Sequence, residues 1–457
     1  KIGLLTPREI GQRLEEQFEL LRHHRRDVPE RQRTLAATID WSWELLEPWE
    51  QLALAQCTVC EGGFELAAGE AVCELSAWDE APPAVDVLQA LVDKSLLRVR
   101  DSLSSGPGRL GMLKAIHKYA DQKLRTPGAV SDTAGTTVTG PSPYDAAVLR
   151  HGRHFARMGQ DKEIEALYQK GGVARRQRLA SELHNLLAAT RRALERVDIE
   201  IATRAGLAAM EVMRLAGPIT TCLELAKRVS DLPHGIEPAA VQVALLAVHV
   251  GEFCGVTAPT RGWAEWAVSA SEKLSDPRLH GRALYSLGWI DVRRGEYDEM
   301  MLYFDAALER HLDTFDKRYE ARTLVQVGGV LHDSGELDGA TERYDRAIAL
   351  LQSVGDQEGE AMAVNRLAIL RWQQGHIDWA LRLYEQGLEL QRRLGNRLGE
   401  ASTLNNLALI AVDHGRTKEA LHLFESALKI SREVGSRSYE ALFLGNLGDL
   451  SLSQGDL

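Results

Sequence analysis

The apolar residues in the last third of the chain follow the spacing of an α-helix. Between positions 400 and 414 they recur every three or four residues and therefore share one helical face, and they are Ala401, Leu404, Leu407, Ala408 and Ala411. Residues 418–434 repeat this spacing. Gly415 stands between the two runs and can adopt the left-handed conformation that ends a helix. The pattern predicts two helices folded into a hairpin.

The hairpin pattern recurs with a fixed period of 40 residues. The turn glycines are Gly295, Gly335, Gly375, Gly415 and Gly455. Nine positions after each of the first four stands an aromatic residue, and these are Phe304, Tyr344, Tyr384 and Phe424. A small residue seven positions before each glycine lets the paired helices approach, and the aromatic ring fills the space between neighbours. Because one hairpin cannot bury its apolar face alone, the copies are expected to stack into a solenoid.

This pattern resembles the tetratricopeptide (TPR) repeat, in a variant lengthened to 40 residues. The resemblance covers residues 276–457, which hold four full copies and half of a fifth. Residues 199–275 read as two degenerate TPR-like hairpins in front of them, and residues 146–198 as a helical connector whose expected helices are 146–159, 162–169 and 175–196. Residues 126–145 are rich in Thr, Gly, Pro and Ser, which predicts a flexible linker.

The N-terminal part predicts a small domain of a different kind. Helical runs begin near Arg33, after Pro48 and at Ala67, and another helix opens at Pro82-Pro83. Two strands are expected next, at residues 95–100 and 109–113, joined by a loop. Helices followed by a β-hairpin are the order of a winged helix, here spanning residues 31–125. The predicted fold class is thus all-α, with a small α/β winged-helix domain followed by an α-solenoid of TPR-type hairpins.

Four segments resemble the region after the nucleotide-binding domain of bacterial signal-transduction ATPases with numerous domains (STAND). They read RQRTLAATIDWSWELL from Arg31, EGGF from Glu61, LQALVDKSL from Leu88 and MLKAIHKYA from Met112. The likeness is to the branch found in antibiotic-regulatory activators. It implies that residues 1–30 are the end of the nucleotide-binding module, that the chain is a fragment of a longer protein, and that the full-length protein can oligomerise.

The chemistry of an ATPase is missing from the sequence itself. A phosphate loop needs a Gly-Lys pair, and none occurs in the chain. The resemblance therefore places ATP or ADP and Mg²⁺ in the absent nucleotide-binding domain, and no cofactor in this chain. Relatives carry a Met-His-Asp triplet that contacts nucleotide, whereas Met112-Leu113-Lys114 stands here, so direct phosphate sensing is not expected. No HExxH, GxSxG or metal-spaced cluster occurs, and we expect no enzyme activity.

Composition sets the remaining bounds. The formal net charge of −11 argues against a nucleic-acid surface over the whole molecule. Five cysteines, an odd number without metal spacing, predict buried thiols in a reducing cytoplasm. The longest apolar run, near Ala239–Val250, is too short to cross a membrane.

The inner surface of the solenoid is the predicted binding site. Positions on the first helix of each repeat that face away from the packing stripe form the candidate groove, and its residues are Tyr285, Trp289, Arg293, His332, Asn365, Trp372, Asn405 and Asp413. Amide side chains suit a peptide backbone, and tryptophan suits an apolar anchor. Both tryptophans could instead fill space between repeats.

Three hypotheses remain. The first is the non-catalytic sensor and autoinhibitory half of a STAND regulator, which binds a protein, peptide or small ligand in the solenoid and relays it through the winged helix to the nucleotide-binding domain. The second is a TPR scaffold for partner proteins. The third is a DNA-binding regulator, against which the acidic residues Asp86 and Asp93 on the expected recognition helix count.

Overall fold

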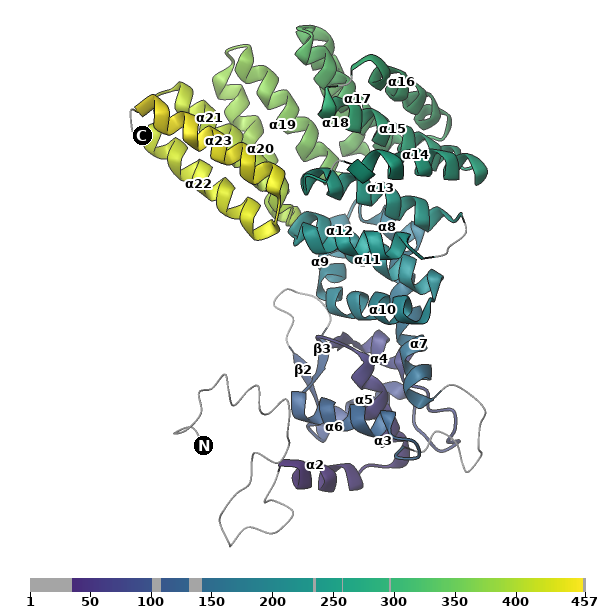
Figure 1. Ribbon diagram of the computed structural model, residues 1–457. Coiled ribbons are helices and arrows are strands. Elements are labelled where there is room, and N and C mark those ends of the chain that lie inside the picture. Colours follow the sequence, from purple (N-terminus) through teal and green to yellow (C-terminus); the bar gives the residue numbers. More distant parts are fainter. Residues whose placement is uncertain are drawn as a thin grey trace. The chain divides into compact units, whose positions relative to one another are not determined.

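The computed structural model describes residues 35–100, 108–130, 142–232, 236–256, 258–295 and 297–454. The predicted end of a nucleotide-binding module, residues 1–30, lies outside this range. The chain divides into two compact units, Lys1–Phe155 and Ala156–Leu457. Figure 1 shows the first unit in purple and blue and the second in teal, green and yellow. Each unit is treated by itself.

The N-terminal unit combines short helices with one small sheet. Its elements are α2 (Leu35–Glu44), α3 (Pro48–Gln56), η3 (Cys57–Val59), β1 (Phe64–Glu65), α4 (Leu66–Val72), α5 (Ala84–Asp93), β2 (Leu97–Arg100), β3 (Arg109–Met112), α6 (Lys114–Arg125) and α7 (Pro143–Ala156). The predicted helices and hairpin occur in the predicted order. The sheet has the order β1-β3-β2 and both pairings are antiparallel.

Strand β1 was absent from the sequence-based prediction. Gly62 and Gly63 have φ angles of +76° and +89°, which glycine adopts without strain and which turn the chain before the strand. Phe64 then pairs with Leu110 of β3. The ring of Phe64 is buried and packs so closely on Gly69 that a Cβ there would lie 2.9 Å from it. The turn at these two glycines thus also positions Phe64, which anchors the sheet.

The predicted linker and connector needed revision. Helix α7 begins at Pro143, so the predicted linker 126–145 ends too late, and its residues 131–141 lie outside the described range. Nearly all of α7, up to Phe155, belongs to the N-terminal unit rather than to the connector. The single helix expected at residues 175–196 is two helices, α9 (Gly172–Ser181) and α10 (Leu183–Arg196), because the chain breaks at Glu182.

The C-terminal unit is a solenoid of helical hairpins, as predicted. After η4 (Arg157–Gly159), α8 (Asp161–Ala166), α9 and α10 come α11 (Ile199–Ala216), α12 (Ile219–Ser230), α13 (Pro238–Phe253), α14 (Ala258–Lys273), α15 (Pro277–Arg294), α16 (Tyr297–Asp313), α17 (Lys317–Asp333), α18 (Leu337–Val354), α19 (Gln357–Gln373), α20 (Ile377–Leu394), α21 (Arg397–Asp413), α22 (Thr417–Val434) and α23 (Arg437–Gln454). Successive helices from α11 to α23 pack on one another in sequence order.

The repeated residues pack as their spacing predicts. The aromatic rings of Phe304, Tyr344, Tyr384 and Phe424 are all fully buried. A Cβ on Gly328 would lie 2.8 Å from the ring of Tyr344, so the paired helices need a small residue at that position. Fully burying one such ring stabilises the fold by about 1.5–3 kcal/mol. The 40-residue period is therefore a packing period.

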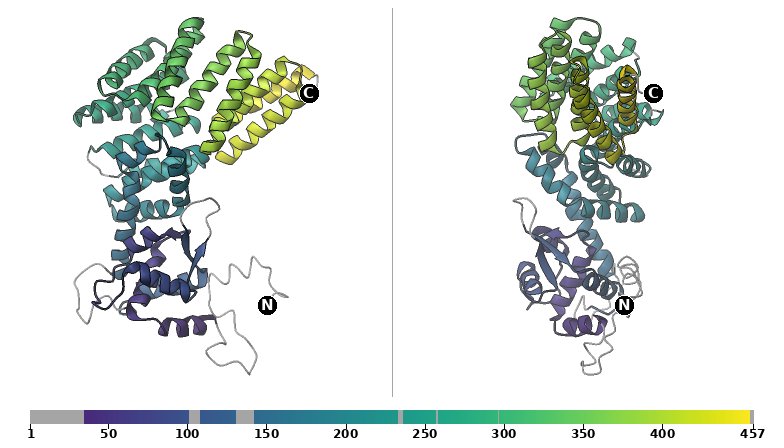
Figure 2. Two further views of the ribbon diagram at one scale, coloured as in Figure 1. Left: turned by 180° about the vertical axis from the view of Figure 1, so that it is seen from behind. Right: turned by 90° about the vertical axis from the view of Figure 1, so that its left-hand side faces the viewer.

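The solenoid curls until its last helices contact its first ones. Helices α21 and α23 touch α11 and α13. The hydroxyl groups of Ser436 and Ser438 donate hydrogen bonds to the carbonyl oxygens of Phe253 and Glu252, at 3.0 and 3.1 Å. Figure 2 shows the arc of green and yellow helices from two further sides. Its inner face is therefore bordered by both ends of the repeat array.

Among the described residues, no helix combines the length and apolar character that crossing a membrane requires. The same residues contain no group of three or more His, Cys, Asp or Glu side chains placed to hold a metal ion. All five cysteines are free; Cys57, Cys60, Cys222 and Cys254 are buried and Cys73 is half-buried.

Candidate ligand-binding cavity on the inner face of the solenoid

A cavity of about 360 Å³ lies on the inner face of the repeats. Its lining comes mainly from the first helix of each hairpin, namely α11, α13, α15, α17, α19 and α21, together with α23. First helices line it because the second helices carry the aromatic residues that fill the space between repeats. Residues more than 200 positions apart, such as Arg214 and Tyr439, thus share one wall.

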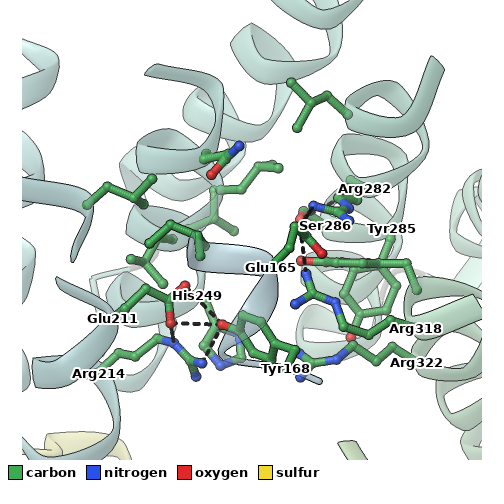
Figure 3. Close-up of a pocket in the computed structure, with 18 of the residues that line it drawn as sticks. Glu165, Tyr168, Glu211, Arg214, His249, Arg282, Tyr285, Ser286, Arg318 and Arg322 are labelled. Atoms are coloured by element: carbon green, nitrogen blue, oxygen red, sulfur yellow. Dashed lines mark hydrogen bonds and ion pairs between the residues drawn. The ribbon is translucent and has the colours of Figure 1, made fainter. Parts of the chain in front are cut away.

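A smaller cavity of about 90 Å³ adjoins the larger one, and both are lined by Arg214, His249, Tyr285, Trp289 and Arg322. Figure 3 shows this smaller cavity with Glu165 and Tyr168 projecting into it. Glu165 belongs to α8, and Tyr168 lies two residues after the end of that helix. The connector in front of the repeats therefore occupies part of the inner face.

Glu165 meets arginines of two successive repeats. Its carboxylate lies 2.6 Å from the guanidinium of Arg282 and 3.4 Å from that of Arg278, both on α15, and 3.7 Å from that of Arg318 on α17. Burial alone would raise the pKa of Glu165, but the positive charges of Arg318 and Arg282 outweigh it and lower the pKa. Glu165 is thus held as a carboxylate between the two helices.

Tyr168 makes the second anchor of the connector. Its hydroxyl group donates to the carboxylate of Glu211, at 2.8 Å, and accepts from the guanidinium of Arg214, at 2.6 Å, both on α11. The guanidinium of Arg318 lies over the Tyr168 ring, 3.8 Å from its centre. Burial raises the pKa of the Tyr168 hydroxyl, so it stays a neutral donor.

Glu358 at the start of α19 forms ion pairs with Arg214 and Arg322, which line both cavities. Its carboxylate lies 2.7 Å from Arg214, 3.2 Å from Arg176 of α9 and 3.8 Å from Arg322 of α17. Burial opposes ionisation of Glu358, but the three guanidinium groups lower its pKa well below the usual range. Buried charges are tolerated only when paired in this way, because an uncompensated one costs several kcal/mol.

One wall of the larger cavity is aromatic. The ring of His249 stacks on that of Trp289 with centres 5.0 Å apart, and Phe253 packs against Tyr439 at 5.5 Å. The guanidinium of Arg293 lies 5.3 Å from the centre of the Trp289 ring. Burial lowers the pKa of His249 to about 3, so its imidazole is neutral at neutral pH.

Another part of the lining is polar. Asn365 and Arg366 of α19 lie there with Gln391 near the end of α20. The side-chain oxygens of Asn365 and Gln391 are buried and have no hydrogen-bond partner among the described residues. Unpaired buried oxygens are uncommon in native proteins and call for a physical explanation.

The eight residues predicted for the groove fall into two sets. Tyr285, Trp289, Arg293 and Asn365 line the larger cavity. The other four lie outside that lining and link successive repeats instead: the Nε1 group of Trp372 donates to Asp413 at 3.1 Å, the amide of Asn446 donates to Asn405 at 2.7 Å, and His332 is hydrogen-bonded to Gln373. Trp372 is half-buried, and Asn405 is buried.

The sequence-based prediction missed the charged part of the site. Glu165, Tyr168, Arg214, Arg322 and Glu358 were not among the predicted residues. One signal was available, because arginines recur with the repeat period: Arg278 and Arg318 are 40 positions apart, as are Arg282 and Arg322. In the next copy the equivalent of Arg318 is Glu358, which reverses the charge.

The sequence model of the tetratricopeptide repeat matches residues 319–393 and 377–433. These residues contain the hairpins α17/α18, α19/α20 and α21/α22. The class of the C-terminal unit is therefore a TPR-containing helical solenoid.

Two mycobacterial proteins are similar to parts of the chain. A Mycobacterium tuberculosis protein named, provisionally, an HTH-type transcriptional regulator is 38% identical over 128 residues, which are 28% of this chain and 14% of that protein. An uncharacterized protein of the same organism is 28% identical over 156 residues, which are 34% of this chain and 36% of that protein. The chain thus spans only a minor part of the length of these relatives.

Two solved structures are similar at low sequence identity. One is a STAND protein with a tetratricopeptide repeat sensor from Pyrococcus horikoshii, with a TM-score of 0.45 at 12% identity over 92% of this chain and 65% of that one. The other is a Rap protein complexed with competence and sporulation factor, with a TM-score of 0.40 at 12% identity over 75% of this chain and 92% of that one.

Proposed function

We propose that the chain is the ligand-sensing half of a STAND-type regulator. In this proposal the N-terminal unit is a winged helix, because helices α2, α3, α4 and α5 precede its β-hairpin and its sheet has the order β1-β3-β2. The segments that resemble the STAND branch of antibiotic-regulatory activators begin in this unit or just before it. The missing part of the parent protein would carry the nucleotide-binding domain and the ATPase chemistry.

One observation carries the sensing role. The larger cavity is lined by helices from the start, the middle and the end of the solenoid, including α11, α19 and α23. A ligand bound there touches both ends of the array at once, and any preference for one curvature shifts the population of that curvature. Binding can thus be relayed along the solenoid, which an open scaffold groove would not require.

DNA reading by α5 has little support. Lys94, which caps the end of α5, is the nearest cation to its acidic residues Asp86 and Asp93. The ammonium group of Lys94 lies 2.6 Å from the carboxylate of Glu50, so its charge is already neutralised. Specific DNA binding depends on cations at the surface that enters the groove. The named transcriptional relatives are matched over only 14% of their length, so their DNA-binding parts need not lie in this region.

The test is a screen of pooled metabolites and short peptides against the whole chain by ligand-observed NMR. Ser402 lines the cavity, and Ser402→Trp should fill it and abolish binding of any true ligand. The matched control is Ser353→Trp on the exposed surface of α18, which should bind as the wild type does. Hits that bind Ser402→Trp and wild type equally would show that the cavity is not the sensor site.

A further inference from the structure

We infer that the larger cavity binds a small organic anion that carries an aromatic or apolar group. This inference rests on the proposed sensing function and names the chemical class of its ligand. Two features of the cavity each select one part of that ligand, namely the charge of its lining and its aromatic wall.

The charge of the lining favours an anion. Four arginines line the cavity, Arg214, Arg293, Arg322 and Arg366, against one carboxylate, Glu358. Three of these arginines are paired inside the protein: Arg214 with Glu358 at 2.7 Å, Arg322 with Asp356 at 3.1 Å, and Arg293 with Glu252 at 3.5 Å.

Arg366 differs from the other three. It forms no ion pair with any residue that the structure describes. Its charge also lowers the pKa of the Tyr285 hydroxyl, although burial, the larger effect, raises that pKa to about 12. Arg366 lines the cavity with an exposed side chain, so its guanidinium is hydrated rather than paired, and a carboxylate, sulfonate or phosphate oxygen matches its bidentate donors.

The aromatic wall favours a planar or apolar group on the same ligand. Trp289 is half-buried, with His249 stacked on one side and the Arg293 guanidinium near its ring. Phe253 and Tyr439 extend this wall towards α23. Binding sites for small molecules combine such apolar walls with a few fixed polar groups, at volumes of roughly 300–1,000 Å³. The cavity volume of about 360 Å³ lies in that range and suits a small molecule better than an extended peptide.

The experiment uses a matched pair of probes with the whole chain. N-acetyltryptophan carries an indole, an amide N–H and a carboxylate, and N-acetyltryptophanamide is its neutral counterpart. Titrations followed by ligand-observed NMR should show that the acid binds at least tenfold more tightly than the amide. Aromatic sulfonates and phosphates should compete with the acid, and inorganic phosphate should not. Equal binding of acid and amide, or no binding of the acid at 10 mM, would overturn the inference.

Variants of Arg366 test whether this residue causes the preference for the acid over the amide. Arg366→Met keeps the apolar stem and should reduce the acid-to-amide preference to below twofold, whereas Arg366→Lys should keep part of it. Arg382→Met removes an exposed arginine of α20 that does not line the cavity and should leave the preference unchanged. A preference that survives in Arg366→Met overturns the inference. If neutral ligands bind and Ser402→Trp abolishes their binding, the sensing role stands and only the anionic class fails.

Discussion

Glu165 of α8 and Arg282 of α15 form an ion pair of 2.6 Å, although 117 residues separate them in the chain. Both side chains are largely buried, with 18% and 6% of their surfaces exposed. The pair fixes the connector on the inner face of the solenoid, where a partner of an ordinary TPR groove would lie. The connector is therefore a structural part of the solenoid's inner face rather than a spacer in front of it.

Glu165→Gln should destabilise the C-terminal unit by roughly 1–3 kcal/mol, because Arg318 loses its carboxylate partner, while Arg282 and Arg278 keep Asp316. Urea unfolding followed by circular dichroism measures this change. Glu163→Gln is the matched control: Glu163 lies on the same short helix, its carboxylate lies 4.0 Å from the ammonium group of Lys162, and both side chains are at least half-exposed. The control should change stability by less than about 0.5 kcal/mol. Equal effects of the two substitutions would show that the ion pair does not hold the connector.

Alanine substitutions at two turn glycines distinguish loss of the connector's contact from the cost of backbone strain alone. Gly355 and Gly395 end α18 and α20 with φ angles of +82° and +66°. A Cβ on Gly355 would lie 2.6 Å from the backbone nitrogen of Lys170, whereas one on Gly395 would meet nothing within 4 Å. Both substitutions by Ala should cost about 1–2 kcal/mol from the left-handed backbone. Only Gly355→Ala should also displace the connector.

Hydrogen exchange of the amides at residues 167–172 provides the measurement. The amide of Gly172 is bonded to the carbonyl of Gln169 at 2.8 Å, so it is protected while the connector keeps its turn. Protection should fall several-fold in Gly355→Ala and stay at the wild-type level in Gly395→Ala. The same loss in both variants would mean that the connector responds to general destabilisation and not to the contact at Gly355.

The repeat architecture could be predicted from the sequence because the residues that determine it lie close together in the chain. Turn glycines, small residues and buried aromatics recur at fixed offsets within 40 residues, and each offset reflects one packing contact. Strand β1 was missed because two residues, Phe64 and Glu65, carry no periodic signal. The break at Glu182 was missed because the apolar spacing continues through it.

Only half of the candidate site could be predicted from the sequence. Residues facing inward on α15 and α19 could be placed by counting from the turn glycines, which gave Tyr285, Trp289 and Asn365. The same count cannot tell how far the solenoid curls, so it could not separate Asn405, which is bonded to Asn446, from a residue that lines the cavity. Nor can any local pattern join Glu165 to Arg282.

Acid should destabilise the C-terminal unit in two steps, and His311 contributes to the first. His311 is fully buried, and neither ring nitrogen has a hydrogen-bond partner among the described residues. Burial lowers its pKa to about 4 from an ordinary 6.5. A depressed histidine pKa means that the unfolded chain takes up the proton first, so stability falls as pH drops below 6.5. At pH 4.5 this amounts to about 2–3 kcal/mol.

His311→Phe should remove the part of this first step that His311 supplies, because the ring is replaced by an apolar one in a site that offers no hydrogen bonds. Buried His249, with its pKa of about 3, still contributes its own part. Thermal unfolding at pH 7 and pH 4.5 tests it, and the difference in Tm between the two pH values should shrink in the variant. The second step remains, because the depressed pKa values of Glu165, Glu211 and Glu358 supply stability that is lost as pH falls below about 4.5 through their folded-state values. An unchanged Tm difference above pH 4.5 would assign the acid sensitivity to other groups.

Alanine substitutions of Trp289 and Trp372 should differ in their effects on ligand binding. Trp289 lines the cavity between His249 and Arg293, so Trp289→Ala removes the centre of the aromatic wall. Losing a central aromatic contact typically costs 2 kcal/mol or more of binding, which is about 30-fold in Kd. Trp372 lies outside the cavity lining and donates to Asp413 of the next repeat, at 3.1 Å.

Trp372→Ala should therefore lower the stability of the repeats while leaving the affinity for N-acetyltryptophan within twofold of the wild type. Trp289→Ala should cause a large loss of affinity together with a loss of stability, because its ring lines the cavity and also packs against the core residues Leu287 and Ile290. Titration of both variants, alongside their urea unfolding midpoints, measures the two quantities on the same samples. If Trp372→Ala weakens binding as much as Trp289→Ala does, the functional surface extends beyond the cavity along the whole row of first helices, as the sequence pattern predicted.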